Sequence, residues 1–244
     1  MEKLINEIKN GNYWRINLLP IDDSFNKQKI NSINECYKII CDNSVLIHGR
    51  CFPHIDRDYG NFPVEDYEIG IDFVEVSLDV DYYREIWRYY QSSQFIFYIA
   101  IEDDYRIDEI KKQGNLPFHL NPNNDSGKYF NIERCIYYVC ELFEFIKRLA
   151  ENGKLESSFE ISLLFKGMED RILFLWERGR DFVPVLKCSV KKIPYNKIYN
   201  TNDFIVNANQ YALEYIIFIM DLFKFKAVYL FKEIQEKFYS KIII

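Results

Sequence analysis

The first group of residues that could bind a metal or take part in catalysis lies in the stretch HGRCFPHIDRD, at positions 48–58. It holds the zinc-binding side chain types His48, Cys51, His54 and Asp56. A structural zinc site needs a second pair of such ligands, and a catalytic site needs three ligands with an oriented outer shell. No second pair of cysteines or histidines lies nearby, so we expect no metal here. The stretch reads as a proline-fixed loop in which His54 bonds a backbone group or a carboxylate.

Carboxylates are the second group of residues that could do chemistry. A metal-dependent nuclease places two or three of them, with a lysine, at the end of a sheet to hold a divalent ion and orient water. No E-x-K sequence follows the acidic residues on a predicted strand, and acids that alternate along a strand are typical of its solvated face. A metal-dependent nuclease or another phosphate-handling enzyme is therefore kept as an alternative. The residues concerned are Asp72, Glu75, Asp79, Asp81, Glu102, Asp103 and Asp104.

The glycine-rich motifs of nucleotide hydrolysis and acyl transfer are absent from the sequence. It contains no G-x-x-x-x-G-K-[ST], no G-x-G-x-x-G and no G-x-S-x-G. We predict no cofactor and no catalytic residue.

The stretch EIWRYYQSSQF, at positions 85–95, crowds aromatic, charged and amide side chains together. A helical turn or two over residues 81–90 would pair Glu85 with Arg88 at i and i+3. Trp87 would then plug the core on the same helix face as Tyr83 and Tyr90. Gln91 and Gln94 would satisfy loop backbone groups. This structural interpretation is the simplest one.

HGRCFPH and EIWRYYQSSQF together resemble a group of poorly characterised bacterial domains. Members of that group carry R-G-W-x-F-P-H and then E-x-W-R-x-Y-Q-S-G-Q-F, and the resemblance covers roughly residues 45–104. His48, Arg50 and Ser93 depart from the pattern, which has Arg, Trp and Gly there. The resemblance implies an accessory or sensor module, found alone or beside nucleic-acid-binding modules and sometimes near defence genes, and it implies no reaction. The matching residues are Gly49, Phe52, Pro53, His54, Glu85, Trp87, Arg88, Tyr90, Gln91, Ser92, Gln94 and Phe95.

A functional interpretation places the proline-containing loop and the amide-rich turn side by side at one sheet edge. Such a pocket would hold a planar or anionic ligand by stacking and hydrogen bonding, and a nucleotide, a nucleic-acid end or a peptide would suit it. The predicted ligand-binding residues are His54, Arg88, Gln91 and Gln94, with Trp87 and Phe52 as walls.

Apolar periodicity supplies the elements that must position these residues. Spacing of three and four predicts helices over 2–10, 30–40, 131–152, 203–223 and 227–242. Strands are predicted over 13–19, 45–47, 67–80, 95–101, 159–165, 171–176 and 185–193, with a hairpin turn at Gly167 between 159–165 and 171–176. Within 67–80, Ile69, Ile71 and Phe73 alternate with polar residues, which predicts a sheet with one wet face.

The order of these elements favours an α+β fold with a mostly antiparallel sheet, flanking helices and a helical C-terminus. We expect one domain over 1–244. A subdivision near 115–130, into 1–114 and 131–244, is the alternative because residues 115–128 read as a long connection.

Net charge and cysteine content limit the partners and the cellular compartment that we expect for the protein. A net charge of −6 without a basic run argues against a general duplex binder and leaves room for a local basic site. The first residues lack the apolar segment of a secretory signal, and the six cysteines read as reduced, mostly buried thiols. Charges interrupt the most apolar window, 211–231, so we expect a cytoplasmic protein without a membrane span.

The leading hypothesis is a non-enzymatic binding, sensor or accessory protein of a bacterial system, with anti-phage defence as the specific case. A protein partner or self-association is expected, and a nucleotide or nucleic-acid end is a further ligand class. A third hypothesis is a structural subunit whose apolar last helices pack on a partner chain, because the exposed isoleucines of 241–244 would otherwise be hard to accommodate.

Overall fold

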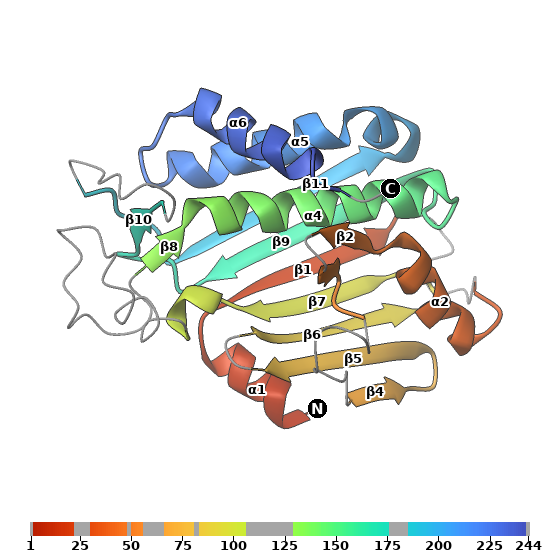
Figure 1. The fold of residues 1–244 in the computed structure, drawn as a ribbon. Helices are drawn as coiled ribbons and strands as arrows, with labels where there is room; N and C mark the ends of the chain where they lie inside the picture. Colours follow the sequence, from red (N-terminus) through yellow and green to blue (C-terminus); the bar gives the residue numbers. More distant parts are fainter. Residues whose placement is uncertain are drawn as a thin grey trace.

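The computed structural model describes residues 2–21, 30–47, 50–55, 66–80, 83–105, 129–175 and 185–242. It confirms the predicted α+β class, with one antiparallel sheet of seven strands in the order β11-β9-β1-β7-β6-β5-β4 (Figure 1). These strands are β1 (Tyr13–Pro20), β4 (Asp66–Ile69), β5 (Phe73–Val80), β6 (Tyr83–Tyr90), β7 (Phe95–Ala100), β9 (Ser158–Lys166) and β11 (Lys192–Asn200). The N-terminal strand β1 pairs with β9, so the two halves of the chain share this sheet.

Two short ribbons accompany the large sheet. The antiparallel pair β2 (Val45–Ile47) and β3 (Arg50–Phe52) lies near α4, and the parallel pair β8 (Tyr129–Asn131) and β10 (Ile172–Phe174) lies beside the start of α4. A 3-10 turn, η1 (Glu102–Asp104), follows β7.

Helices divide the large sheet into a covered and an open face. On the covered face lie α2 (Ile33–Asn43), α4 (Ile132–Glu151), α5 (Thr201–Asp221) and α6 (Val228–Tyr239) (Figure 1). Helix α1 (Glu2–Asn10) packs on the opposite, open face, where Leu4 and Ile8 form a small cluster with Ile86 and Ala100 that is separate from the main core. Since successive strand residues point to opposite faces, Trp14, Ile16 and Leu18 of β1 enter the main core beneath the covering helices.

Helix α4 is the central element of the covering layer. Its N-cap residue Asn131 accepts a hydrogen bond from the backbone N–H of Arg134, and Gly153 just beyond its end has a φ of +65°. Phe143 stacks on Phe204 and Tyr215 of α5. The predicted helices over 131–152 and 203–223 are thus confirmed within two residues at each end.

The hairpin predicted around Gly167 is wrong. Strand β9 pairs with β1 and β11, whereas β10 pairs with β8 in parallel, and Trp176 lies outside the described residues. Gly167 serves a different turn, with a φ of +80° and the side chain of Asn12 so close that an added Cβ would lie 1.8 Å from it. The third strand of this half runs over Lys192–Asn200, later than the predicted 185–193.

The run predicted as one strand over 67–80 is two strands, β4 and β5, joined at Gly70–Asp72. Ile69 and Ile71 were expected to alternate into the core. Ile71 is instead 96% exposed, because it lies in the turn between the strands.

Four of the six cysteines are buried and all six are free thiols, as the sequence predicted. Within the described residues, no helix combines the length and the apolar character that a membrane span requires. Ile242 forms a β-bridge with Ile47 and packs against the main core, so this residue of the apolar tail contacts its own chain.

Candidate functional site

Residues 83–90 form strand β6, and the helical turn predicted there is wrong. Tyrosine, isoleucine and tryptophan favour a pleated surface, and pairing with β5 and β7 on both sides completes the strand. The change of period alters which residues share a face. Glu85, Trp87 and Tyr89 point to the covered face, and Ile86, Arg88 and Tyr90 point to the open face.

The two segments of the predicted site do meet on the covered face. His54 Nδ1 lies 2.6 Å from a carboxylate oxygen of the buried Glu85. Trp87, which is 1% exposed, donates its indole N–H to the backbone oxygen of His54 at 2.9 Å. Phe52 packs against Phe97, with ring centroids 5.5 Å apart, and the Phe52–Pro53 bond is cis. The loop is therefore fastened to the sheet by residues of both segments.

Arg88 does not join His54, Trp87 and Phe52 in one pocket, which corrects the predicted site. It lies on the other side of the sheet, where its Nε contacts the Glu75 carboxylate and its guanidinium lies 4.7 Å from the ring centre of Phe73. Strand alternation gives the physical reason, since residues 87 and 88 of one strand cannot face the same way. His54 and Arg88 thus cannot hold one small ligand between them.

The two predicted amides are also separated. Gln91 is buried and donates to the backbone oxygen of Ile30 at 2.7 Å, as the structural interpretation expected of it. Gln94 donates instead to the side chain of Asn17 on the open face, at 3.0 Å. Between them Ser93 has a φ of +67°, a left-handed conformation that glycine adopts most readily, and the resembling domains have glycine there.

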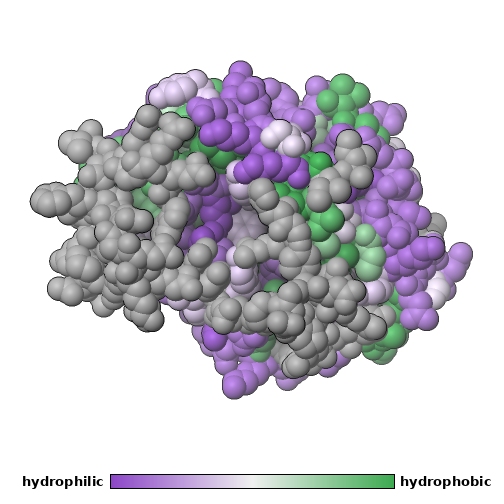
Figure 2. Space-filling view, viewed as in Figure 1, coloured by the Kyte–Doolittle hydropathy of each residue, from purple (hydrophilic) through white to green (hydrophobic). Residues whose placement is uncertain are grey.

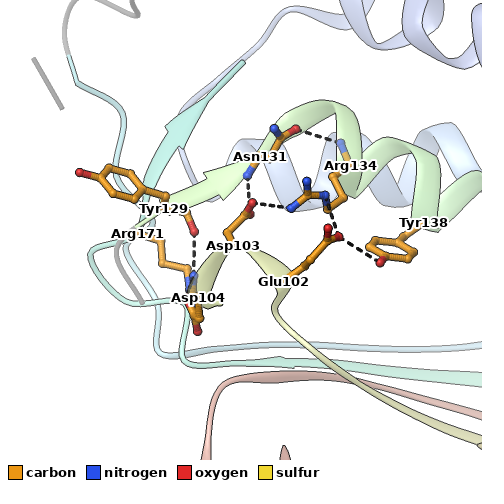
Figure 3. Close-up of polar contacts among 8 residues, drawn as sticks. All are labelled: Glu102, Asp103, Asp104, Tyr129, Asn131, Arg134, Tyr138 and Arg171. Atoms are coloured by element: carbon orange, nitrogen blue, oxygen red, sulfur yellow. Dashed lines mark hydrogen bonds and ion pairs between the residues drawn. The ribbon is translucent and has the colours of Figure 1, made fainter. Parts of the chain in front are cut away.

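A cluster of carboxylates and arginines lies where β7 ends and α4 begins (Figure 3). We call it the carboxylate–arginine cluster, and it consists of Glu102, Asp103, Asp104, Arg134 and Arg171. Arg134 contacts Glu102 at 2.9 Å and Asp103 at 2.8 Å. Arg171, which is fully buried, holds Asp104 through two hydrogen bonds of 2.9 and 2.7 Å and also donates to the backbone oxygens of Tyr129 and Gly167.

These contacts explain what the acidic turn does for the fold. Asp103 accepts the backbone N–H of Asn131 at 2.9 Å, next to the first turn of α4. Asp104 also accepts from the side chain of Asn12 at 2.9 Å. Three sequence-distant segments are therefore joined through carboxylates that the sequence offered as nuclease ligands. Bidentate arginine pairs of this kind are strong and directional.

Beside the cluster lies a small cleft of about 30 Å³, lined by the Glu102, Arg134 and Tyr138 side chains and by Trp14, Phe130 and Phe165. Figure 2 shows hydrophilic surface in a hollow over α4. Tyr138 donates a hydrogen bond to Glu102 at 3.3 Å. The pKa of Tyr138 is raised, mainly by burial and next by the negative charge of Glu102. Burial likewise raises the pKa of Asp103, although Arg134 and the Asn131 N–H act in the opposite direction.

Metal binding finds little support in the described part of the chain. No group of three or more histidine, cysteine or carboxylate side chains lies together there as a metal site requires. The acidic residues of the nuclease hypothesis behave accordingly: Glu75 contacts Arg88, Asp79 contacts Arg84 at 3.0 Å, and Asp81 lies outside the described residues. Glu75 and Asp79 thus each face an arginine of the fold, whereas Asp72 is exposed.

The open face of the sheet is the surface that sequence reasoning missed. Among the described helices only α1 covers it, over β6 and β7. Register partners share a face, so its composition follows from the strand pairing. On β11, β9 and β1 it carries Lys192, Pro194, Asn196 and Ile198, then Lys166, Leu164 and Ser162, then Tyr13, Arg15, Asn17 and Leu19.

Comparison of the chain with family models, with curated proteins and with solved structures gives no match. The site residues therefore have to be judged on their own geometry.

Proposed function

We propose that this chain acts by binding a macromolecular partner, as a sensor or accessory protein, and performs no chemistry itself. The observation that carries the proposal is the open face, a broad sheet surface with charged, amide and apolar side chains on adjacent strands. Pro194 and Asn196 are exposed there, and Ile198 is 63% exposed. An extended face of this kind suits a large partner better than a small substrate, which proteins usually enclose.

The internal pairing of the acidic residues also supports binding over catalysis. A nuclease needs carboxylates that are free to hold an ion and orient water. Glu102 and Asp103 share Arg134, and Asp104 is held by Arg171, so these groups hold the chain together at the end of β7. Their arrangement resembles a structural ion-pair network.

The setting we propose is a bacterial, cytoplasmic defence system against phage. It rests on the resemblance of HGRCFPH and EIWRYYQSSQF to accessory and sensor domains, some of which are encoded near such systems. His54, Glu85 and Trp87, which match that pattern, hold the two segments together in this chain. The partner would be another protein, a second copy of this chain, or a nucleic acid.

The enzymatic alternative is tested by incubating the purified chain with labelled single-stranded and duplex nucleic acids, with Mg²⁺ or Mn²⁺. We expect no cleavage above that of a mock preparation. Metal-dependent cleavage that is lost in Asp72→Asn or Glu102→Gln, with the fold retained by circular dichroism, would overturn the proposal. Asp72 is exposed, so the first variant tests chemistry with little risk to folding.

Hydrogen exchange with a co-purified partner tests where binding occurs. We expect slower amide exchange in β1, β9 and β11, which carry the open face. Protection confined to α4, α5 and α6 would instead support the structural-subunit alternative, in which the last helices meet another chain.

A further inference from the structure

Four cations converge on the open face at the end of β1. Lys192 and Lys166 are direct register partners on β11 and β9, and Lys166 is the register partner of Tyr13 on β1. Arg15 lies one place further along that face, opposite Tyr98 of β7. Lys9 reaches the same place from α1, since Lys166 Nζ donates to the backbone oxygen of Lys9 at 2.7 Å. We call Lys9, Arg15, Lys166 and Lys192 the basic patch.

No carboxylate neutralises the basic patch within the described residues. The acidic groups of the surrounding elements are engaged elsewhere: Glu7 with Lys3 and Arg84, Glu169 with Lys191, and Asp104 with Arg171. Glu160 shares the face, but its register partner is Leu19, beyond Asn17. Like charges directly opposite each other on a sheet destabilise it, so this gathering has a cost that an anionic partner would offset. This local excess of positive charge contrasts with the net charge of −6 of the whole chain.

Aromatic rings alternate with these cations. The rings of Tyr13 and Tyr98 lie edge to face with their centroids 5.7 Å apart. Lys166 Nζ lies 5.1 Å from the centre of Tyr13, and Lys9 Nζ lies 4.8 Å from the centre of Tyr98. The Nε of Arg15 is buried beside them and has no hydrogen-bond acceptor among the described residues.

We propose that the basic patch binds a single-stranded nucleic acid segment across β11, β9 and β1, beside the end of α1. This inference rests on the proposed binding function and names the partner class. Lysine and arginine on a sheet contact phosphates, and the parts of Tyr13 and Tyr98 that stay exposed beside the α1 cluster can contact unpaired bases. Three adjacent strands span roughly 10 Å between their outer backbones at the usual strand spacing, which is room for a short stretch of nucleotides.

The side chains beyond the patch suit the same ligand. Asn17 and Asn196 continue the face along β1 and β11, and amides there can meet the edges of unpaired bases. An anionic membrane would need only the charge, and an acidic protein would need no rings. The combination of rings, amides and cations favours a nucleic acid strand.

Fluorescence anisotropy with the full chain tests the proposal, using labelled thymidine and uridine oligonucleotides of about ten residues. We expect saturable binding whose logarithmic affinity falls with the logarithm of salt concentration by about 0.7 for each phosphate contacted. Three or four contacts give a slope of about −2 to −3. Lys166→Gln and Lys192→Gln should each make the slope shallower by about 0.7.

Lys232→Gln is the matched control, because Lys232 is exposed on α6 in the covering layer and its loss removes the same charge. It should leave both affinity and slope unchanged. The exposed side chain of Lys192 makes no hydrogen bond or ion pair with described residues, so Lys192→Gln tests binding with little effect on the fold. Circular dichroism and a thermal melt would verify this.

Three outcomes overturn the assignment: no saturable oligonucleotide binding, equal effects of Lys192→Gln and Lys232→Gln, or binding of anionic vesicles or polyglutamate in preference to oligonucleotides. If a protein partner protects the open face while oligonucleotides do not bind, only this inference fails and the proposed binding function stands. If the chain cleaves the oligonucleotide, the proposed function itself fails.

Discussion

Charge is treated in opposite ways in two regions of this protein. In the carboxylate–arginine cluster every acidic side chain faces a guanidinium, and Arg171 is fully buried with all of its contacts supplied by the fold. In the basic patch, Lys192 and Lys166 stand opposite each other without a described counter-ion. The charges of the carboxylate–arginine cluster are paired within the fold, whereas those of the basic patch are available to a binding partner.

The contrast separates architecture from recognition. Buried charges must be paired, because an unpaired charge away from water is costly, and the cluster meets this requirement while it joins β7, β8 and the turn at Gly167. Exposed charges carry no such requirement, so an unpaired set on one face is free to meet a partner. The following predictions test this division, starting with the largest expected effect.

Breaking the cluster should cost far more than altering the patch. Arg171→Gln leaves the largely enclosed carboxylate of Asp104 without its guanidinium, and we expect the free energy of unfolding to fall by about 3–5 kcal/mol. Lys192→Gln, the exposed counterpart, should change it by less than about 0.5 kcal/mol. Urea denaturation of both variants measures the difference. Equal losses would show that the two regions do not differ in their role.

The contact between the His54 loop and strand β6 is structural, like the carboxylate–arginine cluster. Trp87→Phe keeps an aromatic ring but removes the indole donor to His54 and leaves space in the core. We expect the free energy of unfolding to fall by about 1–3 kcal/mol, from the unsatisfied carbonyl and the cavity. Chemical denaturation followed by circular dichroism measures it. An unchanged stability would mean that Trp87 does not hold the loop.

The pH dependence of stability should report the burial of Asp103. Burial raises the pKa of Asp103 in the native state above its usual 3.8, so the native state binds this proton more tightly than the unfolded chain. The contribution of Asp103 to stability is therefore present at low pH and is lost as the pH rises from 3.8 through the raised pKa. Each pKa unit between the two states corresponds to about 1.4 kcal/mol.

Asp103→Asn should remove this decline, because the amide does not titrate. Unfolding free energies of the variant and the wild type, measured from pH 4 to pH 8, should differ in slope over the window where Asp103 ionises. Parallel curves for the two proteins would show that Asp103 titrates normally.

The smallest expected effect comes from repulsion within the patch. Because Lys166 and Lys192 face each other across β9 and β11, removing the charge of Lys192 should raise the free energy of unfolding by about 0.2–0.5 kcal/mol at low ionic strength. The gain should disappear near 1 M salt, where screening is nearly complete. A loss of stability in Lys192→Gln at low salt would show that the patch is compensated after all.

Much of the fold could be predicted from local patterns. The helices over 2–10, 131–152 and 203–223, the strands beginning at Tyr13 and Phe95, and the α+β class all follow from apolar spacing and from stop signals such as Gly153. The pairing of β8 with β10 could not be predicted, because a three-residue parallel ribbon leaves no period in the sequence. Strand β6 was not predicted, because Glu85 and Arg88 are three positions apart and would also pair on a helix.

Local sequence patterns predicted only part of the candidate site. A shared pattern correctly suggested that His54 and Trp87 lie together, and the hydrogen bond between them supplies the cause. Arg88 was placed with them because it is adjacent in sequence. The alternation of a strand moved it to the opposite face, where it contacts Glu75.

The sequence by itself determined the composition of the core, most of the elements and the overall negative charge, since these depend on residue type and on spacing within a few positions. Tertiary structure decided which distant charges became neighbours. Arg171 meets Asp104 across 67 positions of chain, and Lys192 meets Lys166 only because β11 lies beside β9. Strand order and register set such distances, and a local pattern carries no information about either one.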